Sequence, residues 1–150
     1  MRVTVFVVMV ICMVCASEAK VANLTEACFR CLCMAPTRCS APKRCFGDFC
    51  GPFNLSKDYW LDAGQPTLLN NDPERKGAFE DCAKDYECAK TIVAGYLEKF
   101  VTDCNNDGVI DCLDHMMVNA NGRYDCSTPL ETTTVGRRWL AAYEKCKVDL

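Results

Sequence analysis

Residues 103–114, DCNNDGVIDCLD, place oxygen-bearing side chains at the spacing of an EF-hand calcium loop. Such a loop uses side-chain oxygens at places one, three, five and twelve, a backbone carbonyl at place seven, and glycine at place six for the sharp turn. The matching ligands are Asp103, Asn105, Asp107, the carbonyl of Val109, and Asp114, with Gly108 at place six. The sequence therefore predicts a structural calcium ion, bound weakly with a Kd on the order of 10⁻⁴ to 10⁻³ M, as in extracellular modules.

A second interpretation of this loop needs no metal. Its last ligand is Asp where a bidentate Glu is usual, and Cys104 and Cys112 lie inside the loop, where disulfides would constrain how it wraps. The alternative is an acidic Asn-Asp-Gly turn between two helices. Thermal unfolding with calcium and with EDTA distinguishes the two. No cofactor other than this calcium ion is expected.

The first 19 residues carry the pattern of a secretory signal peptide. One basic residue precedes an apolar run of about a dozen, and small residues at Ala16, Ser17 and Ala19 suit cleavage near Ala19. The run is shorter than the roughly 20 residues of a membrane-spanning helix. We expect a secreted, extracellular monomer whose single domain covers residues 20–150, with N-glycan acceptors at Asn23 and Asn54. The net charge of −3 and the lack of a basic run argue against nucleic-acid or membrane partners.

Removal of Cys12 and Cys15 with the signal leaves twelve of the 14 cysteines. An even number in an oxidising compartment predicts six disulfides. The spacing Cys28-x-x-Cys31-x-Cys33 would also suit zinc, but the secretory route and the single histidine disfavour a metal there. Six of these cysteines fall between residues 28 and 50, so this stretch is held by cross-links before it is held by a core.

The elements that must position these residues are mostly helical, with a minor irregular sheet, an α+β fold. Thr25 caps a first helix that Pro36 and Pro42 end, and the turn Gly51-Pro52 favours a hairpin within residues 44–55. Apolar residues at three- and four-residue spacing predict the central helix over 88–101. Shorter helices are expected at 57–62, 113–119 and 136–146, with a surface loop over 64–77 and a short turn between Cys82 and Cys88.

The order of these motifs resembles the invertebrate-type lysozymes, also called the destabilase family, and in particular their insect-like branch. The resemblance covers about Cys28 to Cys146, and the motifs that carry it are Cys31-Leu32-Cys33, Cys39, Cys45, Cys50-Gly51-Pro52-Phe53, Tyr59-Trp60-Leu61-Asp62, Cys82 with Cys88, and Tyr96-Leu97. It implies a lysozyme-like α+β fold and hydrolysis of the β-1,4 bond after N-acetylmuramic acid in bacterial peptidoglycan. Some members are also described as isopeptidases.

The family pairing of cysteines, carried onto this chain, implies six bonds: Cys28–Cys112, Cys31–Cys146, Cys33–Cys39, Cys45–Cys50, Cys82–Cys88 and Cys104–Cys126. Many members have two further cysteines, thought to pair, at the positions of Ala63 and Ile92. Both are absent together, so no orphan thiol results.

The active site is where the sequence departs from the family. A retaining glycosidase needs a protonated carboxyl and a second carboxylate about 5 Å away. The family's acid, three residues after the equivalent of Cys33, falls at Pro36, and Asp48 is the only carboxylate near the expected second position. Glu26 has no spacing argument in its favour. Loss of a general acid typically costs on the order of 10² to 10⁴ in rate, so muramidase activity should be weak or absent.

The isopeptidase activity fares little better. The family's histidine falls at Asn119, and His115 is expected to be an ordinary surface or interhelix residue, since a serine or lysine nucleophile needs a positioned base. The sequence thus predicts a family member of weak or no catalysis, or alternatively a non-catalytic glycan-binding protein or a calcium-stabilised scaffold with a protein partner. Phe53, Tyr59 and Trp60 are candidates to line a glycan cleft for bacterial peptidoglycan or a related glycan, although core packing is the expected role of Trp60.

Overall fold

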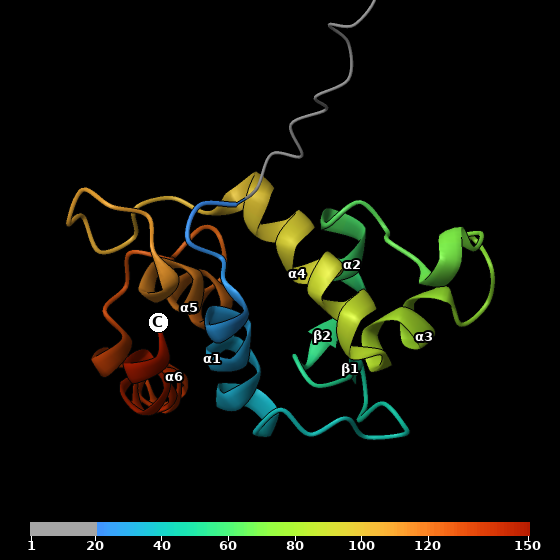
Figure 1. Ribbon diagram of the computed structural model, residues 1–150, viewed down its shortest axis with the longest axis horizontal. Helices are drawn as coiled ribbons and strands as arrows, with labels where there is room; N and C mark the ends of the chain where they lie inside the picture. Colours follow the sequence, from blue (N-terminus) through green and yellow to red (C-terminus); the bar gives the residue numbers. More distant parts are fainter. Residues whose placement is uncertain (1–20) are drawn as a thin grey trace, which may run out of the picture.

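The computed structural model describes residues 21–150, in which six α-helices, three 3₁₀ turns and one two-stranded sheet follow each other along the chain. The predicted signal peptide lies outside these residues. The α+β prediction is confirmed (Figure 1). In order, the elements are α1 (Glu26–Thr37), β1 (Phe49–Cys50), β2 (Leu55–Ser56), α2 (Lys57–Asp62), η1 (Leu68–Asn70), α3 (Ala78–Lys84), α4 (Tyr86–Phe100), α5 (Cys112–Asn121), η2 (Leu130–Thr132), α6 (Thr134–Cys146) and η3 (Lys147–Asp149).

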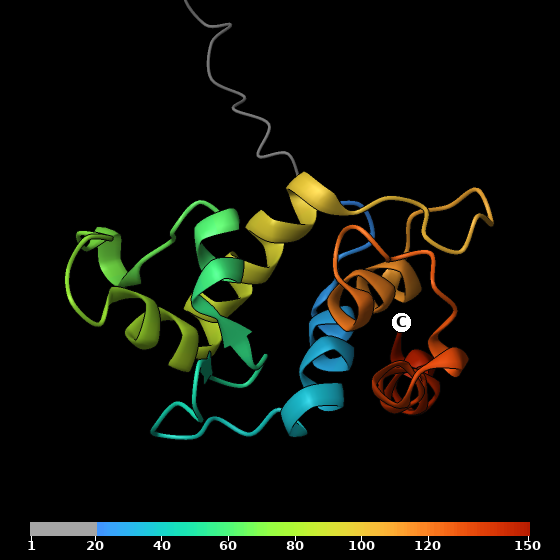
Figure 2. The ribbon, with the colours of Figure 1, turned by 180° about the vertical axis from the view of Figure 1, so that it is seen from behind.

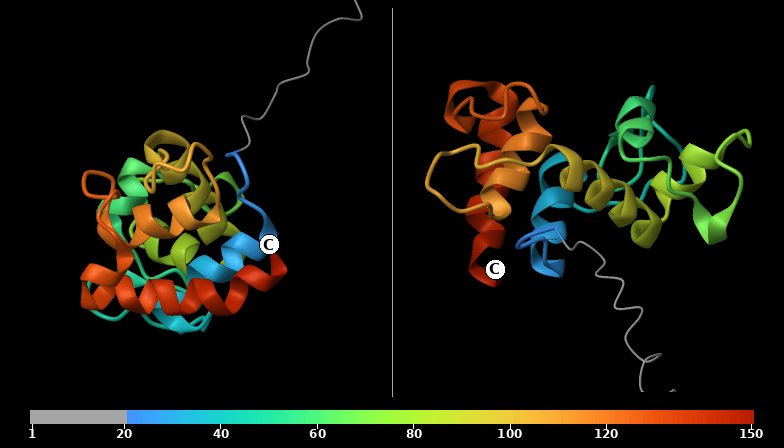
Figure 3. Two further views of the ribbon diagram at one scale, coloured as in Figure 1. Left: turned by 90° about the vertical axis from the view of Figure 1, so that its left-hand side faces the viewer. Right: turned by 90° about the horizontal axis from the view of Figure 1, so that it is seen from above.

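The elements form two groups. Helices α1, α5 and α6 pack on one another, while α2, α3 and the sheet gather around α4. Figure 2 shows the two groups from behind, and Figure 3 shows α6 running across one end of the molecule. Within residues 21–150 no helix is both long and apolar enough to cross a membrane.

Helix α1 follows the sequence signals with one difference. Thr25 caps it by accepting a hydrogen bond from the Cys28 amide at 3.2 Å, as predicted. Pro36 does not end the helix but lies inside its last turn, before the left-handed residue Arg38, at φ 56°. Pro36 has no N–H to donate to the carbonyl of Leu32, so the hydrogen-bond ladder is weakened in this turn, and the helix ends one residue later, at Thr37.

The sheet is a hairpin in the predicted segment. Phe49 pairs with Ser56 and Cys50 with Leu55, around the turn at Gly51. Gly51 has φ +72°, and a Cβ there would meet the Ala83 carbonyl oxygen at 1.6 Å. Only glycine allows the hairpin to approach α3 this closely. Helix α3 was not expected from the sequence, because seven residues with mixed polarity give too short a pattern.

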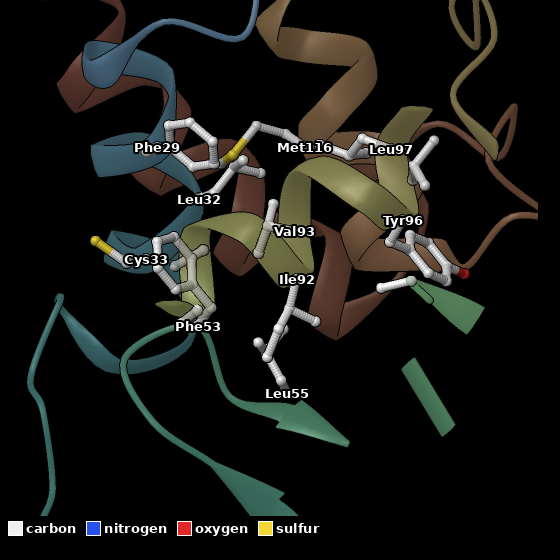
Figure 4. Close-up of a cluster of buried hydrophobic side chains, with 14 of the residues drawn as sticks. Phe29, Leu32, Cys33, Phe53, Leu55, Ile92, Val93, Tyr96, Leu97 and Met116 are labelled. Atoms are coloured by element: carbon white, nitrogen blue, oxygen red, sulfur yellow. The ribbon is translucent and has the colours of Figure 1, made fainter. Parts of the chain in front are cut away.

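The core lies where α4 meets α1, α5 and the hairpin. Ile92, Leu97 and Met116 are fully buried, and Figure 4 shows them with Phe29, Leu32, Phe53 and Leu55. The predicted central helix is α4, which begins at Tyr86, two residues before the predicted start, because Asp85 accepts the Cys88 amide at 2.8 Å and caps it. The expected helices at 57–62, 113–119 and 136–146 are α2, α5 and α6.

All twelve cysteines of residues 21–150 form disulfides, in the pairs that the family resemblance implies. Cys28–Cys112 and Cys31–Cys146 join α1 to α5 and α6 across 84 and 115 residues of chain. In the chain-entropy model, closing loops of that length stabilises a fold by about 4 to 5 kcal/mol each. These two bonds fix the position of α1, whose last turn borders the candidate site.

Candidate functional site

A cleft of about 440 Å³ opens between the last turn of α1, the hairpin, α2, α5 and α6. Pro36 borders it from α1, and its polar lining is formed by Asn54, Ser56, Tyr59, Asn119 and Arg138. None of the described residues that line it is Asp, Glu or His. The position at which the family carries its acid therefore faces a cleft without a carboxyl group.

The other candidate carboxylates lie outside this cleft. Asp48 is exposed in the tight turn between Phe46 and Phe49, whose backbones pair at 2.9 and 3.2 Å. Glu26 starts α1, ten residues before Pro36, which corresponds to roughly 15 Å along a helix. It accepts hydrogen bonds from Lys90 at 2.5 Å and from the Tyr86 hydroxyl at 3.2 Å, and the Lys90 ammonium lowers the pKa of Glu26. Neither carboxylate is placed to serve the cleft.

Tyr59 and Asn119 form a fixed hydrogen-bonding wall of the cleft. The Tyr59 hydroxyl donates to Asn119 Oδ1 at 3.0 Å, and Asn119 Nδ2 donates to the His115 carbonyl at 2.8 Å. The Tyr59 ring stacks on Tyr96 with 3.8 Å between ring centroids. Burial raises the pKa of Tyr59 well above its usual value, so its hydroxyl keeps its proton. This wall can hydrogen-bond a polar ligand but offers no proton transfer near neutral pH.

The predicted aromatic residues divide between cleft and core. Tyr59 and one side of Phe53 line the cleft, although Phe53 is largely buried against Phe29 and Tyr86. Trp60 does not line it: the side chain is 2% exposed and its Nε1 donates to the Pro66 carbonyl at 2.8 Å. Trp60 is therefore a core residue, and its assignment to a glycan cleft was wrong, as the expected core role indicated.

Two aromatic residues of the cleft were missed from the sequence. Phe49, 46% exposed, borders the cleft from the hairpin, and Trp139 borders it from α6. The only signal for Phe49 was its place beside Cys50 in a strand, where neighbouring side chains point to opposite faces. The exposed ring of Phe49 is suited to stacking on sugar rings, whereas Trp139 is 8% exposed and belongs mainly to the core.

His115 is fully buried rather than on the surface. Its Nε2 lies 2.9 Å from the Ala22 carbonyl, and its Nδ1 has no hydrogen-bond partner among the described residues. Burial lowers the pKa of His115. His115 does not line the cleft, whereas Asn119, one helical turn later, does. His115 is therefore not positioned as the base of a serine or lysine nucleophile there.

The predicted calcium loop is organised largely by its own hydrogen bonds. Asp103 accepts from the amides of Asp107 at 3.2 Å and Gly108 at 2.8 Å, and Asn105 and Asp107 accept from nearby amides in the same way. Val109, the predicted carbonyl ligand, lies in the same turn, where its amide donates to Asp107 Oδ1 at 2.9 Å.

Asp114 fits the calcium site poorly. Its side chain is fully buried and accepts from the amides of Cys104 at 2.7 Å, Asn105 at 3.3 Å and Asp111 at 2.9 Å. Together with Asp111 it forms the capping box of α5. Across residues 21–150, no three His, Cys, Asp or Glu side chains gather closely enough to hold a metal ion. Calcium binding stays a prediction. To bind the ion, Asp114 would have to give up hydrogen bonds that it accepts at the start of α5.

The two glycan acceptors differ in their surroundings. Asn23 is exposed, and its Nδ2 donates to the Ile110 carbonyl at 2.7 Å, away from the cleft. Asn54 is also exposed but borders the cleft. A glycan on Asn54 would therefore compete with a ligand, whereas one on Asn23 would not.

Comparisons with known proteins agree with this architecture. A family model described as Destabilase matches residues 25–146. Invertebrate-type lysozyme 3 of Caenorhabditis elegans is 32% identical over 106 residues, which is 68% of this chain and 74% of that protein. A lysozyme of Magallana gigas is 28% identical over 112 residues, 72% of this chain and 73% of that protein.

Solved structures show the same fold at low sequence identity. The chain is similar to one in the complex of Aeromonas hydrophila PliI with Meretrix lusoria lysozyme, with a TM-score of 0.60 and 21% identity over 80% of this chain and 88% of that one. For Tapes japonica lysozyme the TM-score is 0.56, at 21% identity over 82% and 88% of the two chains. With a family model that spans most of its length, the chain belongs to the invertebrate-type lysozyme, or destabilase, family, whose family activity is peptidoglycan hydrolysis.

Proposed function

We propose that the protein is a secreted, monomeric family member that binds the glycan strands of bacterial peptidoglycan, or a related glycan, and hydrolyses them weakly or not at all. The observation that carries this proposal is the cleft at Pro36, whose described lining has no carboxyl or imidazole group. Without a general acid, the leaving oxygen of a glycosidic bond departs unprotonated, which typically costs on the order of 10² to 10⁴ in rate.

The same lining is suited to binding. Phe49, 46% exposed, offers aromatic surface to the faces of sugar rings, and the amides of Asn54 and Asn119 offer donors and acceptors to hydroxyl and N-acetyl groups. Ser56 is not an activated nucleophile: its hydroxyl caps α2 by accepting the Tyr59 amide at 3.2 Å, and no described base lines the cleft beside it.

A wall-binding and lysis assay tests the proposal. We expect the wild-type protein to co-sediment with purified bacterial walls without clearing them. Pro36→Glu restores a carboxyl at the family's acid position, and Pro36→Gln is the matched control because it has the same length without an acidic proton. Only Pro36→Glu should gain lysis, and only in part, because the cleft still lacks a second carboxylate.

Three outcomes decide between the functions. Strong lysis by the wild type would show that another carboxylate acts and would overturn the proposal. Binding without lysis supports it. A protein that neither binds nor lyses walls would favour a scaffold with a protein partner, and would also overturn it.

A further inference from the structure

A second groove, of about 400 Å³, adjoins the cleft. It lies between the end of α1 and α6, and its floor consists of small or apolar side chains such as Ala35 and Ala142. Its cationic side chains are Arg38, Arg138 and Lys145. Pro36 and Arg138 line both this groove and the cleft, so the two lie side by side and share a border.

These three cations are free of acidic partners. No described Asp or Glu lies within 4.0 Å of Arg38, Arg138 or Lys145, and none lines the groove. Lys90 and Arg123, by contrast, each pair with a carboxylate elsewhere on the surface. In a chain of net charge −3, a groove with three exposed, unneutralised cations and no acid is a local region of positive potential.

The positions of the cations are set by rigid elements. Arg38 holds the left-handed cap of α1, where its amide donates to the Met34 carbonyl at 3.2 Å and the next residue is tied back by the Cys33–Cys39 disulfide. Arg138 and Lys145 lie seven residues apart on α6, which places them on one face of that helix. Two arginines and a lysine on fixed backbones can bind an oxyanion without paying to order a loop.

We propose that this groove binds anionic groups, phosphate or carboxylate, carried by the glycan polymer whose sugars occupy the cleft. The inference rests on the proposed function, because a polymer that follows the cleft past Pro36 continues into the groove. It adds that the preferred ligand is an acidic wall polymer rather than a neutral glycan.

The test compares two double variants of the full chain with equal loss of charge. Arg38→Gln/Lys145→Gln removes two cations of the groove, and Arg138 is left intact because it also lines the cleft. Lys43→Gln/Arg44→Gln is the control, since both residues are exposed and line neither the groove nor the cleft.

Three probes are used at low salt: intact Gram-positive walls that carry phosphodiester polymers, the same walls after acid removal of those polymers, and a neutral N-acetylglucosamine hexamer. We expect the groove variant to bind intact walls about tenfold more weakly than the wild type and the control, with hexamer affinity unchanged. The difference should shrink as salt screens the charges. Its loss on stripped walls identifies phosphate as the anion, and its persistence identifies the carboxylates of the remaining peptidoglycan.

Several results would overturn the inference. Equal wall binding by the groove variant and the wild type would do so, and so would an equal loss in the control, which would indicate non-specific charge attraction. A wild-type dimer that the groove variant converts to a monomer in sedimentation equilibrium would assign the groove to a second copy. Hexamer binding without any groove effect leaves the proposed function standing alone. Groove-dependent wall binding without hexamer binding would show an anion-binding groove but would overturn the cleft proposal and, with it, the claim that one polymer occupies both. Binding to no probe removes both.

Discussion

Asp114→Ala should destabilise the fold strongly, and it should do so without calcium. The buried carboxylate accepts three backbone amides, from Cys104, Asn105 and Asp111, and so joins the acidic loop to the start of α5. The mutation leaves those amides without their acceptor. This change therefore distinguishes a structural cap from a calcium ligand.

The size of the effect follows from the three hydrogen bonds. A hydrogen bond to a charged group contributes about 1.5 to 3 kcal/mol. The Cys104 amide is in a buried environment and would lose its partner fully, while the amides of Asn105 and Asp111 are partly exposed and would recover water. We therefore expect a loss of about 3 to 5 kcal/mol for Asp114→Ala. Asp114→Asn keeps one acceptor oxygen and should cost about half as much.

The measurement is guanidinium unfolding with disulfides intact, followed by circular dichroism, in EDTA and in calcium. Asp107→Ala is the control, because Asp107 belongs to the same loop but is exposed and should cost within about 1 kcal/mol. For the wild type, a site with a Kd of 10⁻⁴ to 10⁻³ M would add about 0.4 to 1.4 kcal/mol in 1 mM calcium.

Two results would refute the capping role. One is an Asp114→Ala cost below about 1 kcal/mol in EDTA. The other is a loss seen only with calcium and matched by Asp107→Ala, since two ligands of one ion lose the same binding energy. Stabilisation of the wild type by calcium, with the Asp114→Ala loss still present in EDTA, would show that the loop does both.

Two further predictions concern pH and the aromatic residues. Burial lowers the pKa of His115 in the folded state, so the unfolded chain takes up a proton on this residue first as the pH falls below about 6.5. The free energy of unfolding should then decline by up to about 1.4 kcal/mol per pH unit until the folded pKa is reached. Urea unfolding between pH 7 and 5 should show a smaller change of this free energy with pH for His115→Leu than for the wild type. Phe49→Ala should leave the unfolding midpoint nearly unchanged but weaken wall binding. Trp60→Ala should lower the free energy of unfolding by about 3 to 5 kcal/mol because it leaves a cavity in the core. The opposite pattern would show that Trp60 acts in the cleft.

The sequence predicted helices from a periodic apolar face or from a cap. Helix α4 was predicted from its apolar face alone, without the Asp85 cap that sets its start, and the hairpin was marked by its Gly-Pro turn. Helix α3 offers neither signal, because it has only seven residues and its cap position, Gly77, has no side chain to accept a hydrogen bond. The disulfide pairs came from the family and not from spacing, since twelve cysteines permit far too many pairings for local arguments to separate.

Within the site, the errors have local physical causes. Tyr59 and Trp60 are neighbours on α2, so about 100° separates their side chains around the helix, and they cannot both face one cleft. In the acidic loop, Asp111-x-x-Asp114 is a capping-box pattern that overlaps the last places of the calcium pattern. Asp114 fits both the capping-box pattern and the calcium-loop pattern. The contact that neither pattern includes is the hydrogen bond that Asp114 accepts from the buried amide of Cys104.

The loss of the acid and the positive groove are physically connected. A general acid needs a carboxyl whose pKa is raised, so that it keeps a proton near neutral pH. A carboxyl at position 36 would share both the cleft and the groove with Arg138, and a nearby guanidinium lowers a carboxyl pKa. The positive charges that would attract an acidic polymer to this surface are therefore the ones that would impair a catalytic acid there. Pro36 carries no charge, so it does not weaken the attraction of the groove for such a polymer.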